Sequence, residues 1–234
     1  SGVDTTALIV GDFSNGNDAV ILKEGKSLKD IKGLPVNLVE LSVSHYLLAR
    51  GLESVGMSEK DVSVINTSDA DMVAAYGTGD VKAVVTWNPL VSEILAQPNA
   101  TAVFNSSQIP GEIIDTTMVN SETLAANPAF AKALTGAWYE TMSIMAKDDA
   151  EGKKARSMMA EASGTDLAGY DAQLAATKMF YDAQKAVEFV NSAELPKTME
   201  YVAKFSFDHG LLGDGAADAG FIGMAFPNGK TFGD

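Results

Sequence analysis

The 234-residue sequence has no cysteine, and its only histidines are His45 and His209. Without thiols there can be no disulfide bond, thiolate zinc site or cysteine nucleophile, which is compatible with an oxidising compartment. Two histidines supply few members for a His-rich metal centre or a Ser-His-Asp triad. We therefore expect no metal, no cofactor and no catalytic residue, and we do not expect an enzyme.

Positive charge is also scarce, since 17 Lys and Arg stand against 31 Asp and Glu and give a net charge of −14. Such a chain lacks the basic surface of a nucleic-acid or anionic-membrane binder. No apolar run approaches the roughly 20 residues of a spanning helix, so direct membrane insertion is not expected. The sequence begins without a methionine and without a basic-then-apolar segment, so we expect any secretion signal to lie outside it.

Hydrophobic residues make up 46% of the chain, which is enough for a buried core. In the first half, short β-branched runs alternate with helical segments, a pattern that predicts a parallel sheet with crossover helices. Helices are expected to start at Ser42, at Ser68 or Asp69, and at Pro89, with Gly56 ending the first. The expected strands are residues 6–10, 19–22, 36–40, 62–66, 83–87 and 102–104.

After one more strand at 116–119, the second half is expected to be almost entirely helical. The expected helices are a short one opening at Ser121 and longer ones at 128–147, 153–162, 172–190 and 195–205, before a glycine-rich tail from Asp208. The first half alternates strands and helices, the second half is mainly helical, and no linker separates them. This pattern favours two lobes joined by crossing strands.

Polar residues gather where expected strands end. The segment 11–18 is either a ligand-binding loop or a polar turn. Residues 39–46 form a strand-to-helix junction, where free N–H groups and the helix dipole can hold acceptor atoms of a ligand. The alternative is that Ser42 only caps the helix and His45 is a surface side chain.

Two further residues have open interpretations. Trp87 stands at another strand-to-helix junction and is either a stacking platform for a ligand or a core residue with its N–H bonded to backbone. Asp115 stands where the helical half begins and either lines a cleft or pairs with a lysine.

The order of several segments resembles the substrate-binding proteins of ABC importers of the nitrate, sulfonate, taurine and urea-like class. The likeness lies in the series of segments rather than in one motif. Ser42-Val-Ser-His-Tyr-Leu-Leu48 is similar to the family's Ser-x-x-His-x-Leu-Leu helix start, and Gly56 to Val62 and Gly79 to Ala83 follow at the expected places. The other similar segments are Asn15 to Leu22, Ser27 to Gly33, Thr86 to Pro89 and Ser106 to Gly111. The resemblance implies the type II periplasmic-binding-protein fold, in which two α/β lobes close around a ligand.

The same resemblance implies a division of the chain and a set of partners. Residues 1–14 would be the exit strand of lobe 1, residues 15–114 lobe 2, and residues 115–234 a mainly helical return to lobe 1. The family's N-terminal βαβαβ portion is expected to be absent, which leaves one lobe incomplete. The implied partners are a small-molecule ligand and a transporter permease, and the implied location is periplasmic or otherwise extracytoplasmic.

The resemblance also implies ligand-facing positions for Asp18, Ser42, Ser44, His45, Trp87 and Asp115, and we add Asn17 and Glu40 to the predicted ligand site. Its three carboxylates, and the position of Arg50 and Arg156 outside the motifs, favour a neutral or cationic ligand with N–H donors, such as a urea- or guanidine-like compound.

Three alternatives remain at this point. The first is nitrate, sulfonate or taurine binding on the same fold. The second is an enzyme like the thiamine-pyrimidine synthases, with His45 as the reactive group. The third is the ligand-sensing domain of a regulator.

Overall fold

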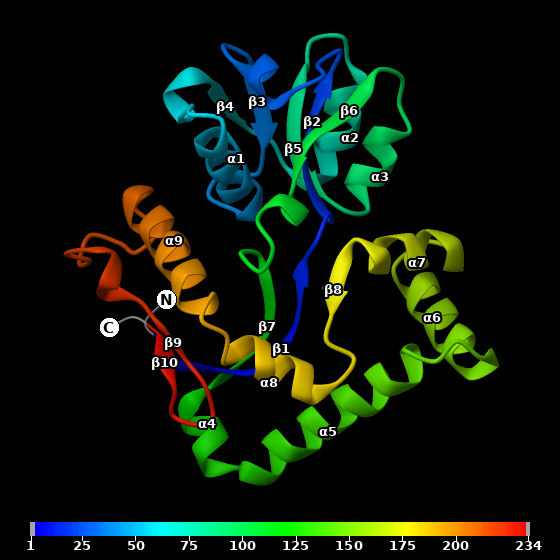
Figure 1. Ribbon diagram of the computed structural model, residues 1–234, viewed down its shortest axis with the longest axis vertical. Helices are drawn as coiled ribbons and strands as arrows, with labels where there is room; N and C mark the ends of the chain where they lie inside the picture. Colours follow the sequence, from blue (N-terminus) through cyan, green and yellow to red (C-terminus); the bar gives the residue numbers. More distant parts are fainter. Residues whose placement is uncertain (1–2, 233–234) are drawn as a thin grey trace. The chain divides into compact units, whose positions relative to one another are not determined.

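The computed structural model describes residues 3–232 and divides into two units. The inserted unit is the continuous segment 14–113, and the terminal unit combines the residues up to Phe13 with those from Ile114 onward. The chain therefore passes from one unit to the other at residues 13/14 and again at 113/114. Each unit has its own sheet and its own helices (Figure 1).

The sheet of the inserted unit has the strand order β4-β3-β5-β2-β6. Its strands are β2 (Asp18–Lys23), β3 (Pro35–Leu38), β4 (Ser63–Asn66), β5 (Ala83–Trp87) and β6 (Ala100–Asn105). Strand β3 is parallel to β4 and β5, whereas β2 is antiparallel to β5 and β6. The predicted parallel sheet is therefore confirmed for β3, β4 and β5 and is wrong for β2. Strands β5 and β6 run parallel to each other and are joined by a crossover connection. Strand β2 lies between them, follows β1 directly in the chain, and runs in the opposite direction.

Helices cover both faces of this sheet. They are α1 (Val43–Ser54), α2 (Asp69–Gly77) and α3 (Leu90–Leu95), with short 3-10 turns at Leu28–Ile31, Glu59–Asp61 and Ser106–Gln108. On one face, Ala19, Ile21 and Val84 pack against α2 and α3. On the other face lies α1, where a Cβ added to Gly51 would stand 3.0 Å from the ring of Phe104. The predicted helix between Ser42 and Gly56 is confirmed.

In the terminal unit the sheet order is β10-β9-β1-β7, and β8 also pairs with β1. Its strands are β1 (Thr5–Ser14, whose last residue belongs to the inserted unit), β7 (Ile114–Asn120), β8 (Thr177–Met179), β9 (Met224–Ala225) and β10 (Thr231–Phe232). Its helices are α4 (Ser121–Ala126), α5 (Pro128–Met145), α6 (Ala150–Ala162), α7 (Leu167–Ala175), α8 (Ala183–Val190) and α9 (Leu195–Asp208), with a 3-10 turn at Ala219–Phe221.

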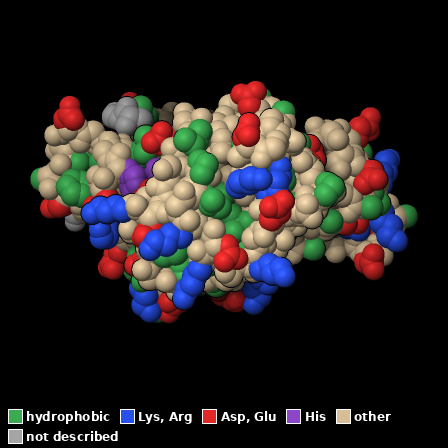
Figure 2. Space-filling model, turned by 90° about the horizontal axis from the view of Figure 1, so that it is seen from above, with side chains coloured by type: hydrophobic (Ala, Val, Ile, Leu, Met, Phe, Trp, Pro, Cys, Tyr) green, Lys and Arg blue, Asp and Glu red, His purple; other side chains and the backbone are tan. Residues whose placement is uncertain are grey.

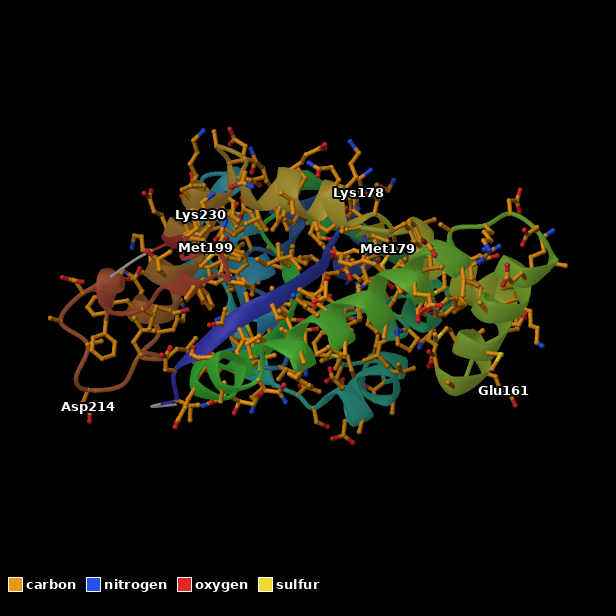
Figure 3. The ribbon with its side chains drawn as sticks, turned by 90° about the horizontal axis from the view of Figure 1, so that it is seen from below. Glu161, Lys178, Met179, Met199, Asp214 and Lys230 are labelled. Atoms are coloured by element: carbon orange, nitrogen blue, oxygen red, sulfur yellow. The ribbon has the colours of Figure 1, made fainter. Side chains whose placement is uncertain are left out.

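The core of the terminal unit forms where β1 meets α8, α9 and the last strands. It consists of Ala7, Val10, Phe180, Ala186, Leu195 and Phe226, with Met199 and Phe232 packed against it. Lys230, labelled in Figure 3, stabilises this region. Its Nζ donates to the carbonyl of Val190 at 2.7 Å and lies over the ring of Phe232. The short strands β9 and β10 interrupt the tail, which the sequence predicted to be loop.

Two local predictions are wrong because tertiary pairing overrides local pattern. The segment 11–18, expected to be a ligand-binding loop or a polar turn between two strands, is mostly strand, since β1 continues to Ser14 and the bend is confined to 15–17. The predicted helix at 172–190 is broken by β8, where the Phe180 N–H donates to the Gly11 carbonyl of β1 at 2.9 Å. Helix α8 then restarts with Asp182 as its cap.

Candidate ligand-binding site

Several strand ends of the inserted unit lie at one edge of its sheet. Because β3 and β5 are parallel and β2 is antiparallel to both β5 and β6, the ends of β3, β5 and β6 meet the start of β2. Asp18 begins β2, and Trp87 ends β5 as its partner in register. Ligands commonly bind at the carboxyl ends of parallel strands, so this edge is the candidate site.

Asp18 is a buried carboxylate at this edge, only 2% exposed. Its Oδ2 accepts a hydrogen bond from the Ser14 hydroxyl at 2.5 Å, and Ser14 Oγ lies 2.6 Å from Ser106 Oγ. Since Ser14 donates to Asp18, Ser106 donates to Ser14, and Ser106 in turn accepts from the Gly16 N–H at 2.8 Å. This relay fixes the orientation of the carboxylate.

The sequence prediction missed Ser14 and Ser106 as site residues. They are 92 positions apart, and only the pairing of β2 with β6 brings them together. Ser106 does open one of the segments that carried the family resemblance, which was the available signal.

The first turn of α1 lies at the same edge, directly after β3. Ser42 is its cap, with Oγ accepting from the Ser44 N–H at 3.1 Å and donating to the Val39 carbonyl at 2.6 Å. Ser44 is 0% exposed, and within residues 3–232 its hydroxyl has no hydrogen-bond partner. A buried hydroxyl without a partner is costly, which makes Ser44 a candidate ligand contact.

His45 is 3% exposed, so its interpretation as a surface side chain is wrong. Its Nδ1 accepts from the Leu41 N–H at 3.1 Å, and its Nε2 lies 2.5 Å from Glu59 Oε1. Hydrogen bonding thus assigns the proton to Nε2, which donates to Glu59. Both ring nitrogens hold protein groups in place, an arrangement suited to fixing the β3–α1 loop.

The loop before α1 is also locally strained. Strand β3 ends at Leu38 rather than Glu40, and Leu41 has a φ of +62°. A non-glycine residue in the left-handed region costs about 1–2 kcal/mol, and such strain gathers at functional sites.

The other predicted residues occupy different environments. Trp87 is half-buried and shares a sheet face with Asp18. Asn17 is half-buried, and its carbonyl accepts from the Asn88 N–H at 3.0 Å. Glu40 is exposed, and its N–H donates to Asn66 Oδ1 at 3.0 Å.

Asp115 differs from the other predicted residues because it lies in the terminal unit, on β7, opposite Asp12 of β1. Asp12 is 9% exposed, and its Oδ1 has no hydrogen-bond partner among the described residues. Burial raises the pKa of Asp12 to about 7, and the charge and hydrogen bond of Asp115 make a smaller contribution in the same direction. The sequence prediction missed this carboxyl pair, which arises from the register of two strands.

Both arginines of the chain are engaged in ion pairs inside their own units. Arg50 binds Glu112 through Nε at 2.7 Å and through Nη2 at 2.9 Å. Arg156 binds Asp171 at 2.8 Å. Figure 2 shows acidic and basic side chains interspersed over the visible face of the molecule. Each guanidinium group is thus already bound to a carboxylate of its own unit.

The fold is that of type II periplasmic binding proteins. The chain is similar to the periplasmic aliphatic sulphonate binding protein SsuA from Escherichia coli, with a TM-score of 0.72, 18% identity, and coverage of 90% of this chain and 70% of SsuA. It is also similar to the periplasmic nitrate-binding protein NrtA from Synechocystis, with a TM-score of 0.60, 14% identity, and coverage of 94% and 63%.

Residues 15–161 match the model of the NMT1-like family, and the chain belongs to that family. A relative from Brucella abortus, named as a binding protein, is 27% identical over 215 residues, which are 89% of this chain and 59% of the relative. The chain thus spans about three fifths of the length of this curated relative. None of the described helices is long and apolar enough to cross a membrane.

Proposed function

We propose that this protein is the solute-binding component of an ABC importer. It captures a small polar ligand outside the cytoplasm and delivers it to the permease. In this proposal the inserted unit is one lobe of the binding protein, and the terminal unit is the part that returns to the other lobe. Membership of the NMT1-like family and the type II fold support a binding protein.

The observation that carries the ligand class is the buried carboxylate of Asp18, oriented by Ser14 at the edge of the inserted sheet. A carboxylate accepts short, charge-assisted hydrogen bonds from N–H donors and repels anions. Trp87 on the same sheet face offers a flat surface on which a planar ligand can stack. We propose a urea- or guanidine-like ligand, bound by Asn17, Asp18, Glu40, Ser42, Ser44, His45 and Trp87, with Asp115 as a further predicted contact.

A sulfonate or nitrate is the second candidate ligand. SsuA and NrtA carry those ligands in their names, and the N-terminus of α1 attracts acceptor oxygens. An enzyme with His45 as the reactive group is not favoured, because both nitrogens of that ring hold neighbouring groups.

Isothermal titration calorimetry with urea, guanidinium, taurine and nitrate at millimolar concentration tests the proposal. We expect heat of binding from urea or guanidinium, and a thermal shift from the same ligand, because a ligand at 100 times its Kd stabilises the folded state by about 2.7 kcal/mol. Asp18→Asn should weaken binding at least about tenfold, since it replaces one acceptor oxygen of the carboxyl group by a donating NH2 group.

The matched control is Glu24→Gln, which changes an exposed carboxylate just past the opposite end of β2 and should leave the affinity unchanged. Heat of binding from taurine or nitrate, and none from urea or guanidinium, would contradict the proposed ligand class.

A further inference from the structure

Asp18 projects from the sheet face that α1 covers. Side chains two positions apart in a strand share a face, so Asp18 lies on the face of Val20. Val20 is the register partner of Phe104 in β6, and Phe104 packs against Gly51 of α1. The opposite face, with Ala19, belongs to α2 and α3.

Ser44 faces the same side of the sheet from α1. The buried stripe of that helix is Ser44, Leu47, Leu48, Gly51 and Leu52. Its spacing places Ser44 in the first turn of the helix, two turns before Gly51 and on the same side, which contacts the sheet. Because α1 follows β3, this first turn lies at the edge where Asp18 begins β2.

The two groups favour opposite hydrogen-bonding partners. The carboxyl oxygens of Asp18 accept hydrogen bonds, as Oδ2 does from Ser14, so this side chain suits N–H donors. The first turn of α1 carries the positive end of the helix dipole, which suits an acceptor oxygen. The buried Ser44 hydroxyl, which has no hydrogen-bond partner in the described chain, can donate to that oxygen.

Common small ligands satisfy this pair of groups to different degrees. Guanidinium has only donors and a positive charge, which the end of the helix disfavours. A sulfonate or nitrate has only acceptors, which Asp18 disfavours. A urea, ureido or primary amide group has a carbonyl oxygen beside N–H donors and is neutral.

We infer that Asp18 and Ser44 together select a neutral ligand with a carbonyl oxygen next to N–H groups, and that guanidinium compounds are rejected. This inference rests on the proposed function and narrows its ligand class. Asp18 receives the N–H groups, while Ser44 and the first turn of α1 hold the carbonyl oxygen.

Three probes with one methyl group each separate the possibilities in calorimetry on the whole protein: N-methylurea, methylguanidinium and methanesulfonate. We expect N-methylurea to bind at least about tenfold more tightly than the other two, the effect of one well-made hydrogen bond to a charged or buried group. Ser44→Ala should weaken N-methylurea by about tenfold and leave the weak affinity for methylguanidinium unchanged. Asp18→Asn should weaken both N–H probes.

Ser54→Ala is the control on the same helix, because its hydroxyl donates to Gly51 at the far end of α1. Tighter binding of methylguanidinium than of N-methylurea would overturn the inference and leave the proposed function standing. Tightest binding of methanesulfonate, or no binding of any probe, would reject the proposed ligand class as well. If Ser44→Ala does not fold, the ranking of the three probes on the native protein decides alone.

Discussion

Two buried aspartates differ in what surrounds their carboxyl groups. Asp18 accepts a hydrogen bond from Ser14 and lies at the edge of a sheet, where a carboxylate can meet a ligand. Asp12 faces the carboxyl of Asp115, so burial and a like charge both favour its protonated form. Asp18 of the inserted unit is therefore a hydrogen-bond acceptor, whereas Asp12 of the terminal unit favours its protonated form.

The pKa of Asp12 predicts a pH-dependent stability. Between pH 3.8 and about 7 the unfolded chain ionises this group while the folded protein keeps it protonated, so stability falls as the pH rises through that window. Asp12→Asn stays neutral at every pH. The free energy of unfolding of the variant minus that of the native protein should therefore be larger at pH 8 than at pH 4. The increase should be at most about 4 kcal/mol, because each unit of pKa shift corresponds to about 1.4 kcal/mol.

Chemical denaturation of both proteins at pH 4 and pH 8 measures this difference. Asp115→Asn should remove only part of the pH dependence, because burial is the larger cause of the shift. Equal differences between Asp12→Asn and the native protein at the two pH values would show that Asp12 titrates normally.

At the scale of elements, local pattern and tertiary contact compete for the same residues. The strand at 83–87 was predictable from its run of β-branched residues, and the helix after Ser42 from its cap and its terminal glycine. Residues 172–190 carry a helical pattern, yet β8 forms inside it because β1 offers a backbone partner. Only the assembled sheet reveals that partner.

Two helix glycines should respond in opposite ways to alanine. A Cβ at Gly136 in α5 would meet nothing within 4 Å, whereas a Cβ at Gly152 in α6 would stand 2.0 Å from the Lys147 carbonyl. Gly136→Ala should raise the free energy of unfolding by about 0.5–1 kcal/mol, the helix preference of alanine over glycine. Gly152→Ala should lower it, because backbone must move.

Thermal or denaturant unfolding of the two variants tests this pair, with each glycine as the control for the other. Stabilisation by both alanines would mean that the first turn of α6 does not approach Lys147 in the folded protein.

At the scale of the whole molecule, the inserted unit is built as a closed segment. The Ser14 N–H donates to the Ile113 carbonyl at 2.9 Å, so the two ends of the segment are hydrogen-bonded neighbours. Helices cover both faces of its sheet. Arg50 of α1 forms an ion pair with Glu112, which is next to the last residue of the inserted unit. Such a segment has the features of an independent folding unit.

We therefore expect residues 14–113 to fold when expressed alone. Circular dichroism should show helix and strand, with one cooperative thermal transition. The matched control is the segment 14–99, which lacks β6 and its buried Phe104 and should lose cooperativity because β2 is left with an open edge. A gradual, non-cooperative melt of residues 14–113 would contradict the expectation.

The sequence by itself determined most of the local elements and the class of fold. Periodicity, caps and turn glycines are properties of neighbouring residues, and the order of motifs along the chain resembles that of binding proteins.

The tertiary structure decided what lies next to what. It set the antiparallel direction of β2, joined Ser106 to Ser14 and Asp18, buried His45 against Glu59, and placed Asp12 opposite Asp115. These pairs are distant in sequence, and their association depends on strand order and register. Strand order and register are fixed by packing of the whole sheet, which local pattern does not encode.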